Sequence, residues 1–386
     1  MFTEELQQLT LPLETADGGL SVKEILEDPE WSATAQDYKE PRLIPKRTGG
    51  MRKIQEPKPY LKRLQTAISF ELARLYGPSK YAHAFIRAKK GRVRNLRSNA
   101  LPHIGHKYLV KLDLKDFFPS CAPQLVGEAL KYEVDIPDWL YSLVMRACFL
   151  DGGLPQGAPS SPILSNIAAR KLDYRIARLC EAWRREPMKA CRPFKSPRMH
   201  PIAYTRYADD ITLSSNYDIP AKDVRKRLRR GGYINDVERG KKPVWALHNI
   251  LHPIRIIVED CGFKIKDKKI KKFKAPQRLE VCGAVVGQET VNAKRRHRRR
   301  WRGRLHAMIA DIENSVVSPG HFKHKDEAGK VTVRRISKRM LKRIQGKIAA
   351  LVAISPQLKP YFFGGKDDKG KEWRGELVHL RKLCKK

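Results

Sequence analysis

The chain has 386 residues, with 79 Lys and Arg against 41 Asp and Glu, which gives a formal net charge of +38. Its composition, 41% hydrophobic and 31% charged, is that of a globular protein, and no apolar run approaches the roughly 18 residues of a membrane-spanning helix. Repulsion among so many positive charges favours a polyanionic partner; nucleic acid is the expected one, ahead of an anionic membrane surface, because clustered Lys and Arg bind phosphates and release counterions.

The first 30 residues carry eight acidic side chains and the single base Lys23. They form either a solvated helical face or a contact with the basic body of the protein or with a partner. The opening MFTEELQQLT has no signal-peptide pattern, and the seven cysteines lack the spacing of zinc ligands. We therefore expect a cytoplasmic protein with reduced thiols.

The first predicted elements are a hairpin, a helix and a strand. Residues 42–54 read as two short strands joined by the Gly-rich turn at 48–50. Apolar residues at helical spacing predict an amphipathic helix over 61–75. The alternating stretch KYLVKLDLKDFF (107–118) predicts a strand whose last residues lead into a loop.

Further along the chain, a Gly/Pro loop opens a helix within 152–179, and a basic stretch at 183–201 reads as a loop insertion. YTRYADDITLSS lies in a predicted hairpin over 202–215, and residues 221–230 look helical and basic.

The last third of the chain combines a short strand pair at 279–287 with the densest basic run, KRRHRRRWRGR at 294–304. Trp301 within that run either stacks on a base or packs into its own helix. A final helix ends near Ser355-Pro356, as helices do before proline. Strands interleaved irregularly with helices predict an α+β chain with a helical C-terminal lobe.

Three aspartates are the candidate chemical site. Asp209 and Asp210 occupy the predicted hairpin turn, and Asp113 ends the strand at 107–118. A hairpin turn and a neighbouring strand end can meet at one edge of a sheet, and three ionised carboxylates that close require a cation. Oxygen ligands of this kind suit Mg²⁺, and two such ions would activate a hydroxyl and stabilise a leaving pyrophosphate. The alternative is a solvated turn in which Asp is simply favoured.

RYADDITLSS, VKLDLKDFFPS and LPQGAPSSPILSN together resemble the palm of a reverse transcriptase, in the family's order, over roughly residues 40–290. The resemblance implies a right-hand polymerase with fingers, an RRM-like palm sheet and a helical thumb. The implied segments are an acidic N-terminal helical segment at 1–40, fingers at 41–105, a palm at 106–290 with fingers insertions and a basic loop near 183–201, and a basic helical thumb with a C-terminal tail at 291–386.

The same resemblance implies site residues and two Mg²⁺ ions. The metal-binding catalytic triad is Asp113, Asp209 and Asp210. The residues implied to bind the incoming deoxynucleotide, with Phe118 in the place that excludes a ribose 2′-hydroxyl, are Lys46, Arg52, Phe118, Gln156 and Lys269. Lys268 is the alternative to Lys269, and Gly157 is expected to permit a close approach of backbone.

NALPH (99–103) resembles the NAxxH element of retron reverse transcriptases, and VCG (281–283) resembles a second retron element in which Thr is usual at Cys282. That resemblance implies contacts with a cognate structured noncoding RNA. The implied RNA-binding residues, with those of the basic run, are Asn99, His103, Arg295, Arg296, Arg298, Arg299 and Arg300.

A retron enzyme would prime from a 2′-hydroxyl of its own noncoding RNA, use dNTPs, and make branched multicopy single-stranded DNA. It would work in a bacterial cytoplasm with an effector protein in antiphage defence, without a membrane. Two alternatives stay open: another bacterial reverse transcriptase, of the group II intron or abortive-infection kind, and a catalytically idle RNA-binding protein.

Overall fold

The computed structural model divides into two compact units. Unit 1 contains residues 1–94 and 106–276, and unit 2 contains residues 95–105 and 277–386. The structure describes residues 27–28, 30–46, 49–87, 93–185, 202–216, 251–313, 321–325, 331–335, 337–366, 372–373 and 375–383. The predicted acidic segment, the basic loop near 183–201 and the helix at 221–230 lie largely or wholly outside these residues.

The predicted hairpin and helix both lie in unit 1. Strand β1 (Arg42–Pro45) pairs antiparallel with β2 (Met51–Ile54), with Arg42 opposite Ile54. Gly49 and Gly50 both have positive φ, as the tight connection requires. Helix α3 (Pro59–Leu75) starts with proline in its first turn, where the missing N–H has no helical partner, and buries Leu61, Leu64, Ile68 and Leu72.

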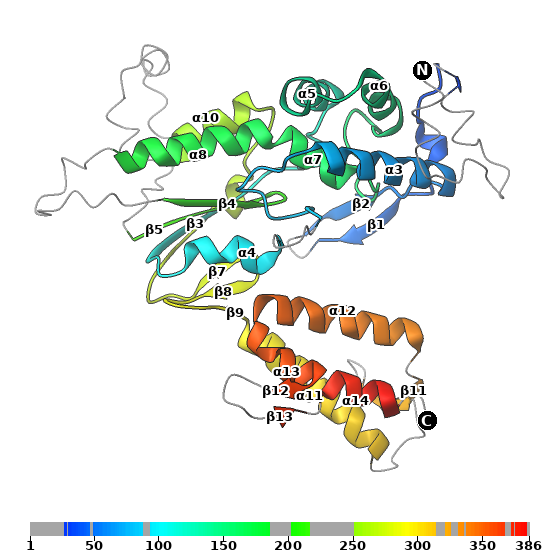
Figure 1. The fold of residues 1–386 in the computed structure, drawn as a ribbon, viewed down its shortest axis with the longest axis vertical. Helices are drawn as coiled ribbons and strands as arrows, with labels where there is room; N and C mark the ends of the chain where they lie inside the picture. Colours follow the sequence, from blue (N-terminus) through cyan, green and yellow to red (C-terminus); the bar gives the residue numbers. More distant parts are fainter. Residues whose placement is uncertain are drawn as a thin grey trace, which may run out of the picture. The chain divides into compact units, whose positions relative to one another are not determined.

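Unit 1 contains a four-stranded antiparallel sheet in the order β4-β5-β3-β6. Figure 1 labels β3, β4 and β5 of this sheet. Its strands are β3 (Tyr108–Asp113), β4 (Ala203–Tyr207), β5 (Asp210–Ser215) and β6 (Lys271–Lys274). The turn between β4 and β5 and the end of β3 lie at the same edge, because Asp113 is paired with Asp210. The predicted meeting of strand end and hairpin turn is therefore confirmed.

Helices cover one face of this sheet. Val110 and Leu112 of β3 and Ile211 and Leu213 of β5 share a core with apolar residues of α8 (Arg170–Arg185) and α10 (Leu251–Asp260). The loop at 152–160 leads into α7 (Ser161–Ala168), which precedes α8. The remaining helical elements of unit 1 are η1 (Ala35–Asp37), α5 (Pro123–Ala129), η3 (Leu130–Val134), α6 (Asp138–Ala147) and η6 (Asp267–Lys269).

Unit 2 joins the short segment at 95–105 to the C-terminal part of the chain. Helix α4 (Leu96–Ala100) and η2 (Leu101–His103) accompany a three-stranded sheet of β7 (Leu279–Val281), β8 (Ala284–Val286) and β9 (Val291–Ala293). Gly105 N donates to Gly287 O at 3.1 Å. Residues 95–105 therefore belong to unit 2, whereas the sequence prediction placed them in one segment with residues 41–94.

The helical part of unit 2 has its own core. Leu305 and Ile309 of α11 (Arg295–Glu313) pack with Ile344 and Ile348 of α12 (Lys338–Ile354). Trp301 packs against the same core, as the second interpretation of that residue predicted. The other elements are β10 (His321–Lys325), β11 (Val331–Arg335), η7 (Pro356–Leu358), α13 (Lys359–Phe363), β12 (Gly365–Lys366), β13 (Glu372–Trp373) and α14 (Glu376–Leu383).

The structure is thus a mixed fold of helices and antiparallel sheets, as predicted. Its two units cut across the predicted segments, so the assignment of fingers, palm and thumb stays a prediction. Among the helices that the structure describes, none has the length and apolar character needed to cross a bilayer.

Candidate active site

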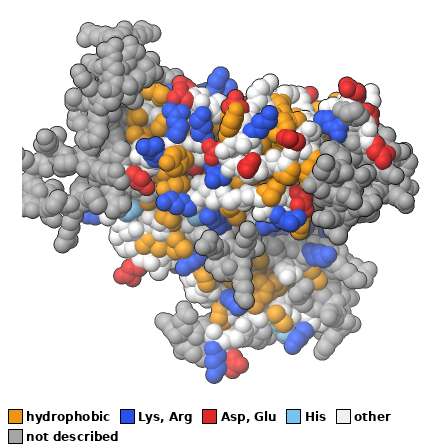
Figure 2. All heavy atoms as spheres, turned by 45° about the horizontal axis from the view of Figure 1, so that its top comes forward, with side chains coloured by type: hydrophobic (Ala, Val, Ile, Leu, Met, Phe, Trp, Pro, Cys, Tyr) orange, Lys and Arg blue, Asp and Glu red, His pale blue; other side chains and the backbone are white. Residues whose placement is uncertain are grey.

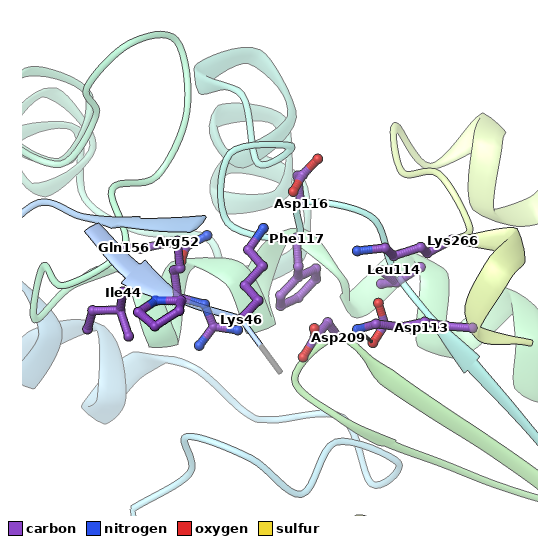
Figure 3. A pocket seen from close by; sticks show the side chains of 12 residues that line it. Ile44, Lys46, Arg52, Asp113, Leu114, Asp116, Phe117, Gln156, Asp209 and Lys266 are labelled. Atoms are coloured by element: carbon purple, nitrogen blue, oxygen red, sulfur yellow. Dashed lines mark hydrogen bonds and ion pairs between the residues drawn. The ribbon is translucent and has the colours of Figure 1, made fainter. Parts of the chain in front are cut away.

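A pocket of about 380 Å³ opens at the sheet edge where β3 ends and β4 turns into β5 (Figure 3). It combines residues from the β1–β2 hairpin, the end of β3, the loop before α7 and the segment before β6. Its lining residues are Ile44, Pro45, Lys46, Arg52, Asp113, Leu114, Asp116, Phe117, Gln156, Asp209, Lys266 and Lys269. Six of these twelve are residues predicted from sequence motifs, and the fold brings them to one place.

The tight β4–β5 turn presents Asp209. Ala208 adopts a left-handed backbone with φ of 57°. Leu114 N donates to Asp209 O at 2.9 Å, which ties the turn to the end of β3. Asp113 and Asp209 both line the pocket, and Asp210 faces Asp113 in the strand register without lining the cavity. Two of the three predicted carboxylates therefore reach the cavity wall directly.

Electrostatics at this edge disfavour negative charge. Burial raises the pKa of Asp209 to about 6, and the neighbouring carboxylates of Asp210 and Asp113 act in the same direction. Lys269 opposes the shift. Because ionised Asp209 is disfavoured here, the site would gain from a bound cation.

Lys269 places a positive charge beside the carboxylates. Its Nζ donates to Asp113 Oδ2 at 2.5 Å, and its side chain is about one-third exposed. Lys268 does not line the pocket, whereas Lys266, which the sequence motifs do not predict as a site residue, does. The structure thus places Lys269 rather than Lys268 beside the carboxylates, and its role toward a nucleotide stays a prediction.

The opposite wall is basic and comes from the hairpin. Figure 3 shows Lys46 and Arg52 across the cavity from Asp113 and Asp209, with Phe117 between them. Gln55 N donates to Gln156 O at 2.8 Å, which joins the end of β2 to the loop before α7. The pocket therefore has carboxylates, one of them paired with Lys269, on one side and Lys46 and Arg52 on the other, a charge pattern suited to a ligand that carries both metal ions and phosphates.

Gly157 permits this join. Its φ is +126°, and a Cβ built there would lie 2.8 Å from Gln55 O, closer than carbon and oxygen can approach. The expected close approach of backbone at Gly157 is confirmed.

Phe118, the residue predicted to exclude a ribose 2′-hydroxyl, lies beside the pocket-lining Phe117, with the two ring centres 5.8 Å apart. Phe117, not Phe118, lines the pocket, and Phe118 is half-buried with its ring 5.9 Å from that of Phe85. Both side chains follow a left-handed Asp116, where φ is 43°, so the direction of each ring depends on a tight turn that the sequence pattern does not reveal. The exclusion of ribose by Phe118 stays a prediction.

In unit 2 the two short elements predicted to contact RNA lie side by side. Asn99 Nδ2 donates to Cys282 Sγ at 3.4 Å. Asn99 and His103 have no exposed surface, so direct contact with RNA would require these side chains to leave their packed positions. In this structure both side chains pack inside unit 2, and their contact with RNA stays a prediction.

The arginines of the basic run differ from Asn99 and His103 in exposure. Arg295, Arg296, Arg299 and Arg300 are exposed on α11, and Arg298 is half-buried. Exposure leaves the predicted phosphate contacts available, and those contacts stay a prediction.

The chemistry of the donor set fits divalent cations. Carboxylate oxygens are the ligands that Mg²⁺ prefers, and Asp113 and Asp209 offer them into one cavity. Within the described ranges, no three Asp, Glu, His or Cys side chains are grouped closely enough to hold a metal ion by themselves. A metal at this edge would therefore complete its coordination with water or ligand oxygens.

Comparisons with known proteins agree with the sequence resemblance. The family described as "Reverse transcriptase (RNA-dependent DNA polymerase)" matches residues 44–292. The chain is 28% identical to the retron Mx65 reverse transcriptase of Myxococcus xanthus, covering 70% of this chain and 56% of that protein. It is 35% identical to the retron Ec83 reverse transcriptase of Escherichia coli, covering 45% of this chain and 51% of that protein.

Telomerase from Candida albicans, solved in complex with a telomeric RNA fragment, aligns with a TM-score of 0.40 and 11% identity over 83% of this chain and 56% of that one. The chain spans about half the length of each of these proteins.

Proposed function

Because the chain belongs to the reverse transcriptase family, which generally uses divalent metal ions, we propose that it synthesises DNA on an RNA template in the pocket at the β3 and β4–β5 edge. The observation that carries the proposal is the convergence of Asp113 and Asp209 with Lys46, Arg52 and Gln156 around one cavity. All five were selected from sequence motifs that lie far apart along the chain.

Each wall of the pocket would have a distinct task. Asp113 and Asp209, with Asp210 beside them, would hold two Mg²⁺ ions. When bound, these ions would lower the pKa of the primer hydroxyl and neutralise charge on the leaving pyrophosphate. Lys46 and Arg52 would orient the triphosphate of a dNTP, and Lys269 would release Asp113 and turn toward phosphate. Binding both partners in line would supply much of the rate, as in other phosphoryl transfers.

We further propose that the protein is a retron-type enzyme that extends from a 2′-hydroxyl of its own structured RNA. The similarity to retron reverse transcriptases and the pairing of NALPH with VCG in unit 2 support this proposal. Its cognate noncoding RNA, its branched DNA product and an effector protein active in antiphage defence would then be its partners.

The test uses nucleic acid from bacteria that express the gene with its native flanking region. We expect a small DNA whose gel mobility changes on treatment with debranching enzyme, and we expect its loss in Asp209→Asn. Primer extension in vitro without any such DNA would exclude the retron type and favour another bacterial reverse transcriptase. If the protein makes no branched DNA and extends no primer but still binds RNA, it would be an idle RNA-binding protein.

Gly157→Ala should weaken nucleotide use. An added methyl must push the loop from Gln55, and alanine is strained at this φ, at a cost of about 1–3 kcal/mol. We expect KM for dNTP to rise roughly 5- to 150-fold, with RNA affinity unchanged, in primer extension at varied dNTP concentration.

Gly152→Ala is the matched control for that substitution. Its φ is +76°, but no atom lies within 4 Å of the added carbon. If both variants change KM equally, backbone strain rather than the contact with β2 is responsible.

A further inference from the structure

Arg206 is an arginine with no exposed surface, on β4 directly ahead of the Asp209 turn. Its guanidinium forms a two-pronged ion pair with Asp173 of α8, which is also fully buried. Nε donates to Oδ1 at 2.7 Å and Nη2 to Oδ2 at 2.8 Å. Tyr204 donates its hydroxyl to the same Oδ1 at 2.6 Å.

Stability alone does not explain a buried ion pair. Removing two charges from water costs several kcal/mol per ion, and apolar replacements are often equally stable or more so. The remaining contacts of Arg206 indicate what else it does. Its Nη1 donates to Ala208 O at 3.1 Å and to Asn166 Oδ1 at 3.1 Å.

The contact with Ala208 bears on the active site. Ala208 is the left-handed residue immediately before Asp209, and its carbonyl accepts the hydrogen bond from Arg206. Leu114 N holds the carbonyl of Asp209 from the β3 side at 2.9 Å. The peptide units on both sides of Asp209 Cα are therefore held, which sets the direction in which its Cα–Cβ bond leaves the turn.

The same group reaches two further segments. The Arg206 guanidinium carbon lies 5.8 Å from the centre of the Phe117 ring, which lines the pocket. The Arg206 backbone accepts from His83 N at 2.9 Å and donates to Tyr81 O at 2.8 Å. Asn166 Nδ2 donates to Ala84 O at 2.8 Å. One buried network thus joins the turn, α7, α8 and the segment at 81–84.

We propose that Arg206 is a positioning residue for DNA synthesis, acting through Ala208 to aim Asp209, with Asp173 and Asn166 holding the guanidinium in place. This inference rests on the proposed function. It assigns Arg206 no contact with RNA, nucleotide or metal. Removing its hydrogen bonds should therefore lower the rate of incorporation without changing the affinity for either substrate.

The test variant is the double substitution Arg206→Met with Asp173→Leu. It removes both charges together and leaves neither buried alone, so the fold is expected to survive. We expect kcat for incorporation on a primed RNA template to fall about 10- to 100-fold, as misplacement by about 1 Å can do. KM for dNTP and the Kd for RNA should change less than about threefold, because Arg206 is assigned no contact with either substrate.

Two further variants keep the test decisive. Arg206→Lys retains the charge but cannot form all of these hydrogen bonds, so it should show the same fall in kcat. It serves as the test if the double variant does not fold. Gln65→Leu removes another fully buried polar group, which donates to Ala147 O at 2.8 Å, and should leave kcat unchanged.

A double variant with wild-type kcat would overturn the inference and leave the proposed function standing, as would an equal fall in kcat in Gln65→Leu at matched stability. Wild-type protein without Mg²⁺-dependent incorporation would overturn both.

Discussion

Asp209→Asn is expected to lower Mg²⁺-dependent incorporation of dNTP by on the order of a thousandfold or more, because several kcal/mol of transition-state stabilisation would depend on that carboxylate. Asn keeps the shape of Asp but carries no charge. Asp210→Asn should act in the same direction. RNA binding should survive in both, because neither residue belongs to the basic surface of α11. Single-turnover extension of a primed RNA template, with RNA binding measured in parallel, checks both expectations.

Unfolding should not account for the fall in activity. The raised pKa of Asp209 means that its ionised form is disfavoured in the folded protein, so stability falls as the pH rises from the ordinary Asp pKa of 3.8 to about 6, and the full cost remains at higher pH. In Mg²⁺-free buffer at neutral pH, Asp209→Asn should therefore melt no lower than the wild type.

Asp260→Asn is the matched control for charge removal. Asp260 of α10 forms a surface ion pair with Arg175 of α8 at 2.8 Å, and such pairs contribute little to stability. It should retain wild-type activity. Full synthesis by Asp209→Asn and Asp210→Asn alike would contradict the assignment of the site.

The sequence predicted the acidic half of this site well, because local pattern and chemistry agree there. The alternation of apolar and polar residues predicted a strand that ends at Asp113, and YADD predicted a hairpin turn. Antiparallel pairing of these strands was then sufficient to bring the carboxylates together. Gly157 followed from the need for close backbone approach, which only glycine meets at that φ.

Other features depended on tertiary contacts that the pattern does not encode. Phe117 rather than Phe118 lines the cavity, next to the left-handed Asp116, and the sequence pattern reveals neither feature. The placement of 95–105 beside β7–β9 depends on pairings across nearly 200 residues of sequence, such as that between Asn99 and Cys282. The position of Arg206 is unusual in the sequence, because YTRYADD has a charged residue within a strand that is otherwise largely uncharged. Its partner Asp173 could not be predicted, because it is 33 residues away.

Salt should weaken RNA binding steeply if the basic surface serves nucleic acid. Exposed basic residues recur on α11 and α12, and Lys and Arg side chains are spread over the face shown in Figure 2. A protein that neutralises about six phosphates loses roughly a thousandfold in affinity between 50 and 200 mM salt, because each neutralised phosphate releases condensed counterions. Binding of a structured RNA measured across this range gives the slope directly.

Local binding can be separated from overall charge by two matched triple variants. Arg295, Arg296 and Arg299 on α11 are exposed, and so are Lys131, Lys171 and Arg178 in unit 1. Replacing the first three with Gln should lower the slope by about one for each phosphate that is no longer neutralised. Replacing the second three should change it much less, because counterion release requires a side chain at the phosphate. Equal effects would show that net charge, rather than the α11 surface, governs binding. A flat salt response in the wild type would mean that the charge of +38 serves a purpose other than holding RNA.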